Sequence, residues 1–86
     1  GVVDIEKEIV VFGGEYHADA NELIIESGSR QNDVWGFNVY VDRPRDSWIE
    51  YISLINIKPQ AGNTEMEIQD KNIRDNMKAI INSKIE

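Results

Sequence analysis

Residues 34–58 read VWGFNVYVDRPRDSWIEYISLINIK, and this stretch decides the fold. Apolar and polar side chains alternate over its first eight residues, which is the period of a β-strand. A charged segment, residues 43–46, follows, and an apolar run over residues 48–58 comes after it. The pattern predicts a β-hairpin whose antiparallel strands cover residues 34–42 and 48–58.

The turn of this hairpin sets its register. Pro44 suits the second position of a type I turn, so a four-residue turn would pair Asp42 with Ser47 and place Trp35 opposite Leu54. A slip by one residue is the alternative, and it would exchange the faces of one strand. We prefer the four-residue turn, because it places fewer polar side chains on the face that would form the core. The other face then carries Gly36, Asn38, Tyr51 and Ser53.

The residues before this hairpin predict a second hairpin and a helix. The β-branched runs Val2–Glu6 and Ile9–Gly13 favour two short strands. Asp19 suits a helix N-cap, and an acidic residue three positions later completes a capping box. Gly28 suits the left-handed position after a helix. We therefore expect a helix over residues 19–27, with a strand as the alternative because two isoleucines are adjacent there.

The residues after residue 58 predict a loop and a second helix. Pro59 ends the strand, and residues 64–69 alternate again, which fits a short edge strand or a tethered loop. Asp70 suits the N-cap of the last helix. Its apolar stripe has helical spacing and consists of Ile73, Met77, Ile80, Ile81 and Ile85.

The element order β-β-α-β-β-α predicts a single α+β domain over residues 1–86. We expect two layers, with a mostly antiparallel four-stranded sheet and both helices on one face. The chain begins with Gly1-Val2 inside an apparent strand. From this start we expect that a native N-terminal segment precedes it.

Composition narrows the classes of function. The net charge is −7, and residues 1–27 hold seven acidic side chains against Lys7 alone. Such a surface repels phosphate backbones and anionic lipid, so we expect no nucleic acid and no membrane as partner. The chain has no Cys, which excludes disulfides and thiolate metal sites. No membrane span or signal peptide is evident, and we expect a cytoplasmic protein.

His17 is the only histidine, and Glu15 and Asp19 lie two residues to either side of it. The three could hold a metal ion, although short motifs of this kind are weak evidence. His17 could also be a general base for Ser27, Ser29, Ser47 or Ser53, but none of these lies in a nucleophile elbow. We therefore predict no cofactor, leave an enzymatic role open while leaning against it, and favour a non-catalytic binding or protein-interaction module. A homodimer or a protein partner would suit so small a core.

The alternative is a small-ligand- or metal-binding protein, or an enzyme, with a polar site around His17. That site requires the side chains of His17 and Asn38 to converge on one pocket. Its predicted members are Glu15, His17, Asp19, Gln31, Asp33, Asn38 and Asn63.

Five motifs resemble a small prokaryotic protein family catalogued as a domain of unknown function. They are Glu15–Asp19, Gly28–Gln31, Asp33–Gly36, Ser53–Pro59, and Gly62-Asn63 with Met66–Ile68. The resemblance covers nearly the whole chain. It implies an additional amphipathic segment before the position of Val2, and an Arg where this chain has Lys58. It implies no activity, but it directs attention to the polar residues of these motifs rather than to the turn at residues 43–46.

Overall fold

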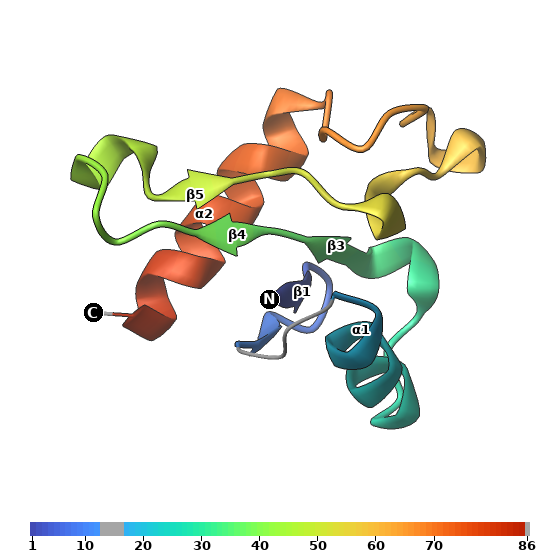
Figure 1. The fold of residues 1–86 in the computed structure, drawn as a ribbon. Coiled ribbons are helices and arrows are strands. Elements are labelled where there is room, and N and C mark those ends of the chain that lie inside the picture. Colours follow the sequence, from blue (N-terminus) through green and yellow to red (C-terminus); the bar gives the residue numbers. More distant parts are fainter. Residues whose placement is uncertain (13–16, 86) are drawn as a thin grey trace.

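A computed structural model describes residues 1–12 and 17–85 and shows an α+β domain (Figure 1). The α+β class is therefore confirmed, but the strands lie in two sheets rather than in one four-stranded sheet. The three-stranded sheet has the order β2-β1-β3, and a separate hairpin pairs β4 with β5; both are antiparallel. The elements are β1 (Val2–Asp4), β2 (Ile9–Val11), α1 (His17–Glu26), β3 (Val34–Gly36), β4 (Asn38–Val39), β5 (Ile49–Glu50) and α2 (Lys71–Ile85).

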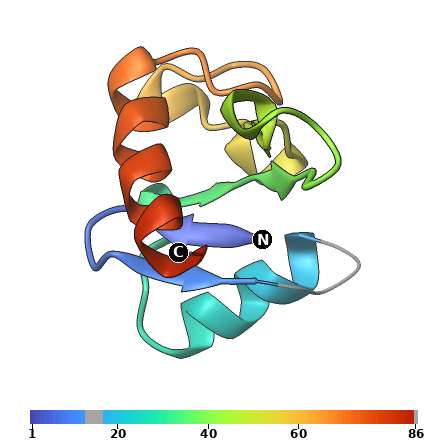
Figure 2. The same cartoon turned by 90° about the vertical axis from the view of Figure 1, so that its left-hand side faces the viewer.

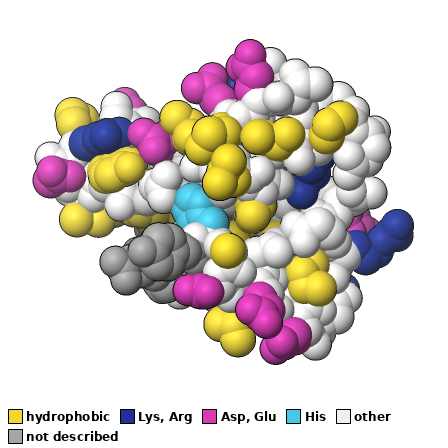
Figure 3. Space-filling view, turned by 45° about the vertical axis from the view of Figure 1, so that its right-hand side comes forward, with side chains coloured by type: hydrophobic (Ala, Val, Ile, Leu, Met, Phe, Trp, Pro, Cys, Tyr) yellow, Lys and Arg dark blue, Asp and Glu magenta, His cyan; other side chains and the backbone are white. Residues whose placement is uncertain are grey.

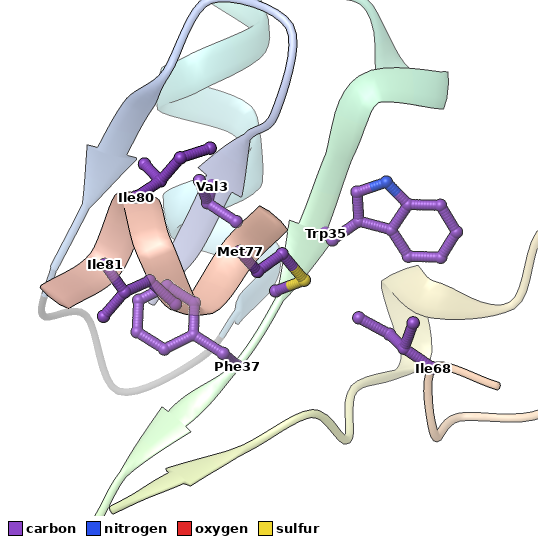
Figure 4. Close-up of a cluster of buried hydrophobic side chains, with 7 residues drawn as sticks. All are labelled: Val3, Trp35, Phe37, Ile68, Met77, Ile80 and Ile81. Carbon is purple, nitrogen blue, oxygen red and sulfur yellow. The ribbon is translucent and has the colours of Figure 1, made fainter. Parts of the chain in front are cut away.

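The two helices cover opposite faces of the three-stranded sheet, as Figure 2 shows. The prediction that both lie on one face is wrong, because neighbouring positions in the strands are both apolar. Val3 and Trp35 pack on the α2 side, whereas Val2 and Val34 pack on the α1 side. Figure 4 shows the larger cluster, with Met77 of α2 lying among its neighbours; its buried members are Val3, Trp35, Phe37, Ile68, Met77, Ile80 and Ile81.

The first hairpin is confirmed over residues 2–11, and Asp4 explains its turn. This residue is fully buried, and its Oδ1 accepts hydrogen bonds from the backbone N–H groups of Glu6 and Lys7, both at 2.9 Å. An Asp side chain that binds the backbone two and three residues ahead stabilises a turn. Glu8 adopts the left-handed conformation just before β2, with φ of 57°. The predicted strand end at residues 13–14 lies outside the described residues.

The second hairpin has a register one residue away from the predicted one. Val39 pairs with Ile49, and the Tyr40 N–H donates to the Trp48 carbonyl at 2.8 Å. Pro44 has φ −53° and ψ 144°, which is not the conformation of a type I turn, and residues 45–47 form a 3₁₀ turn. The connection is therefore longer than four residues. Leu54, predicted for the core, lies beyond β5 and is 72% exposed.

The return strand ends after Glu50 and does not continue to residue 58. Ile52 and Lys58 form isolated β-bridges, to Glu67 and Asn63, and residues 54–56 form a 3₁₀ helix. The side chain of Asn56 there takes the place of a neighbouring strand. Its Oδ1 accepts from the Gly36 N–H at 2.7 Å, and its Nδ2 donates to the Gly36 carbonyl at 3.1 Å. A side-chain amide thus completes the backbone hydrogen bonding of β3.

Residues 64–69 were expected to form either a short edge strand or a tethered loop, and the structure shows the loop. It makes a single β-bridge at Glu67, and the side chain of Asn63 holds most of the rest. The Asn63 Nδ2 donates to three backbone carbonyls, at 2.8, 2.9 and 3.1 Å. Its Oδ1 accepts from the Gln69 N–H at 2.8 Å. One buried amide therefore replaces a ladder of strand hydrogen bonds.

The helices agree with the sequence except at the start of α1. That helix begins at His17, so Asp19 lies in its first turn and is not its N-cap. Gly28 takes the left-handed conformation after the helix, with φ of 107°, and its N–H donates to the Ile25 carbonyl. Asp70 caps α2 by accepting from a backbone N–H at 2.8 Å. Within residues 1–12 and 17–85, no helix is long and apolar enough to cross a membrane.

Candidate functional site

A pocket of about 420 Å³ lies beside the first residue of α1, on the face shown in Figure 3. The histidine, cyan in that view, is one of its lining residues, and apolar side chains lie next to it. The lining residues come from α1, β4 and the two loops after β5. They are His17, Ala18, Asn38, Ile52, Ser53, Leu54, Ile55 and Met66. None of these eight carries a fixed charge.

Both ring nitrogens of His17 have partners. Its Nε2 is 2.8 Å from the Phe37 carbonyl oxygen, and its Nδ1 is 2.6 Å from the Ser53 hydroxyl. A carbonyl oxygen can only accept, so Nε2 carries a proton and donates it to Phe37. In the neutral ring Nδ1 then has a free lone pair and accepts the proton of the Ser53 hydroxyl. The geometry therefore selects one tautomer of His17.

Burial keeps this imidazole neutral. It lowers the pKa of His17 below the ordinary value, and the nearby α-amino group of Gly1 acts in the same direction. Hydrogen bonds to the Phe37 carbonyl and to the side chain of Asn38 oppose the shift without reversing it. At neutral pH the ring is consequently in the form that can accept a proton.

Gly36 makes room for Ser53. A Cβ atom at residue 36 would lie 2.5 Å from the Cβ and 2.6 Å from the Oγ of Ser53, closer than any side chain tolerates. The serine is 3% exposed, and its hydroxyl also accepts from the Ile55 N–H at 3.4 Å. A glycine inside a strand often marks such a close approach. Here it allows the hydroxyl to reach the imidazole across β3.

Of the seven predicted site residues, the structure brings His17 and Asn38 together in the pocket. The Asn38 Nδ2 donates to the Glu50 carboxylate at 3.2 Å and to the Ile52 carbonyl at 3.3 Å. Both hydrogen bonds are at the long end of the usual range. The amide of Asn38 is therefore held loosely and can turn toward a ligand.

Four of the other predicted site residues lie within the described part of the chain, and they do not line this pocket. Asp19 is exposed on α1, and Gln31 is exposed and bonded to the side chain of Asn21. Asp33 belongs to a 3₁₀ turn before β3, and Asn63 is a buried structural residue. Glu15 lies outside the described residues. The fold thus places Asp19, Gln31, Asp33 and Asn63 outside the lining of the pocket.

From the sequence, Ser53 was one of four serines considered as a nucleophile for His17, and it was rejected because it does not lie in a nucleophile elbow. The signal that could have found it was present, since the predicted hairpin already placed Ser53 on the same face as Gly36 and Asn38. A glycine on that face indicated a close contact across the strand. The pairing with His17 could not be read from the sequence, because 36 residues separate the two.

A metal site at His17 finds no support in the geometry of the described residues. Among residues 1–12 and 17–85, no group of three or more His, Cys, Asp or Glu side chains is placed to hold an ion. Both ring nitrogens of His17 already have hydrogen-bond partners.

We expect the stability of the domain to fall as the pH drops through about 6.5, the ordinary pKa of histidine. The folded-state pKa of His17 is lower than this, so the unfolded chain binds the proton first and is favoured by acid. The contribution of the neutral His17 ring to the stability of the fold is fully present above about pH 6.5. It is lost as the pH falls toward the folded-state pKa. Urea denaturation between about pH 5 and 7 measures it, and His17→Gln should abolish the slope there. Equal slopes in the two proteins would contradict the assignment.

The fold and the pocket define a small α+β domain with a pocket that is lined by a histidine and has no fixed charge among its lining residues. The chain belongs to a protein family described as "protein of unknown function (DUF5674)", whose family model matches residues 1–84. This confirms the resemblance seen in the sequence. No curated protein and no solved structure matches the chain.

Proposed function

We propose that this chain is a small binding module whose pocket at His17 takes an uncharged small molecule with an apolar body and a carbonyl group. The observation that carries the proposal is the lining of the pocket, which has five apolar side chains, three polar ones and no fixed charge. Its volume of about 420 Å³ falls in the usual range for small-molecule sites. Such sites typically combine apolar walls with a few convergent polar groups.

The apolar part of the ligand would contact the rim of the pocket. Leu54 is 72% exposed and Met66 is 41% exposed, and both line the opening. A ligand that covers them removes apolar surface from water, which favours binding. A carbonyl group of the ligand would accept a hydrogen bond from the Asn38 amide, whose present bonds are long. An anion is disfavoured, because the net charge is −7 and no basic side chain lines the pocket.

We expect Leu54→Ser to weaken the binding of hexanamide, a neutral probe of this chemistry, by about tenfold. Leu23→Ser is the matched control, because Leu23 is also exposed, at 60%, but does not line the pocket. Chemical shift changes in a two-dimensional NMR titration would measure both affinities. Hexanoate, which carries a negative charge, should bind more weakly than hexanamide. The proposal fails if hexanamide leaves the signals of the pocket residues unchanged.

The homodimer or protein partner expected from the sequence stays a prediction. The outer edge of β2 is the surface that would suit it, since this strand pairs with β1 on one side and carries the half-exposed Ile9.

A further inference from the structure

We infer that the pocket is also a catalytic site, in which Ser53 is the nucleophile and His17 its general base, for transfer of the acyl group of small uncharged esters to water. The inference rests on the proposed function, because the substrate would occupy the same pocket. It gives that pocket a reaction and narrows its ligands to esters.

The geometry of the two side chains is that of an activated nucleophile. The Ser53 Oγ lies 2.6 Å from the His17 Nδ1, within hydrogen-bond reach. A third group orients the base, since the Phe37 carbonyl accepts the proton on Nε2 at 2.8 Å. Serine hydrolases need the same three functions, namely a nucleophile, a base and a group that fixes the tautomer of the base. Here a backbone carbonyl has the role that a carboxylate has in many of them.

A purely structural role would not require so short a contact between Ser53 and His17. The alternative role of Ser53 is to cap the 3₁₀ turn over residues 54–56. That bond, from the Ile55 N–H to the hydroxyl, is 3.4 Å long, whereas the bond to the imidazole is 2.6 Å. The Ser53 hydroxyl thus makes its shorter hydrogen bond to the histidine and its longer one to the turn. Because the ring is neutral, it can take the hydroxyl proton.

The remaining lining residues supply what an acyl transfer also needs. The amide of Asn38 can donate a hydrogen bond to the oxyanion that forms during attack, as side-chain amides do in other acyl-transfer sites. Leu54, Ile55 and Met66 form an apolar wall for the acyl chain. The absence of fixed charge among the lining residues selects an uncharged ester over a charged one.

The reaction balances without a cofactor. The Ser53 Oγ attacks the ester carbon as its proton moves to the His17 Nδ1, and a tetrahedral oxyanion forms. The C–O bond to the leaving alcohol then breaks, and the alcohol takes the proton from Nδ1. A water molecule next attacks the acyl-Ser53 ester and gives a proton to Nδ1. Release of the carboxylic acid returns that proton to the Ser53 Oγ.

The test uses p-nitrophenyl butyrate as substrate and an alkyl fluorophosphonate as covalent probe of an activated serine. We expect the wild-type chain to release p-nitrophenol and to carry the probe on Ser53, as located by peptide mass spectrometry. Ser53→Ala and His17→Gln should each lower the rate at least 100-fold. Ser47→Ala is the matched control, because this serine is exposed in the hairpin loop away from the pocket, and its rate should stay unchanged.

Two results would overturn the inference: a Ser53→Ala rate equal to that of the wild type, or a wild-type chain whose Ser53 stays unlabelled. If Ser53→Ala does not fold, as judged by circular dichroism, the labelling of the wild-type chain decides alone. Binding of hexanamide without labelling or turnover would remove only the catalytic role. Loss of hexanamide binding as well would remove the proposed binding function with it.

Discussion

Replacement of Asn56 by Ala is expected to lower the free energy of unfolding by about 3–5 kcal/mol. Asn56 is fully buried, and its amide satisfies both the N–H and the carbonyl of Gly36. The same Nδ2 also donates to the carbonyl of Met66 at 3.1 Å. Without the amide the N–H and the carbonyl of Gly36 stay buried without partners, and each costs about 1–3 kcal/mol. The Met66 carbonyl keeps the hydrogen bond that it accepts from the Ser53 N–H at 3.1 Å.

Urea denaturation followed by circular dichroism would measure this change. Asn76→Ala is the control, because Asn76 is exposed on α2 and its replacement should change the stability by less than about 0.5 kcal/mol. Asn56→Asp is a sharper variant, since it keeps the shape but replaces donors by an acceptor. It should destabilise at least as much as the Ala variant. A loss below about 1 kcal/mol in both variants would show that the amide does not hold β3.

Replacement of Gly36 by Ala is expected to destabilise the fold by about 1–3 kcal/mol and to separate Ser53 from His17. The backbone of Gly36 does not have a positive φ, so the cost comes from contact and not from conformation. The new Cβ would lie 2.5 Å from the Ser53 Cβ and 3.2 Å from the Ile55 Cγ1. A neighbouring side chain must therefore move, and Ser53 is the nearest one.

Gly62→Ala separates the two physical effects. Gly62 has φ of 81°, and nothing lies within 4 Å of a Cβ added there. This variant should lose about 1 kcal/mol through backbone strain while the His17–Ser53 hydrogen bond stays intact. The ¹⁵N shifts of the imidazole ring report that bond, and ester hydrolysis gives a second readout. If Gly36→Ala leaves the ring shifts and the hydrolysis rate unchanged, the close approach has no role in the site.

The parts of the fold that follow from the sequence are those with local causes. Asp70 and Gly28 act on backbone groups within a few residues of their own positions, so the sequence alone located the start of α2 and the end of α1. The stripe of α2 likewise needs only the helical period. The first hairpin was found through its β-branched runs.

The parts that did not follow depend on distant partners. The register of the second hairpin turned on the conformation of Pro44, which also fits turns other than type I. The strand over residues 51–58 failed because the Asn56 amide replaces its hydrogen bonds to β3, 20 residues away. For the same reason the sequence placed His17 and Asn38 in one predicted site but rejected Ser53, which contacts His17 only where α1 meets the loop after β5.

Because this fold depends on buried side-chain amides, deamidation would damage it. Asn56 and Asn63 each donate to several backbone carbonyls. Spontaneous hydrolysis of either amide would leave a carboxylate, which can only accept hydrogen bonds when ionised. Its oxygens would then face carbonyl oxygens inside the protein. Loss of one nitrogen atom would convert a stabilising contact into a repulsive one, with the sequence otherwise unaltered.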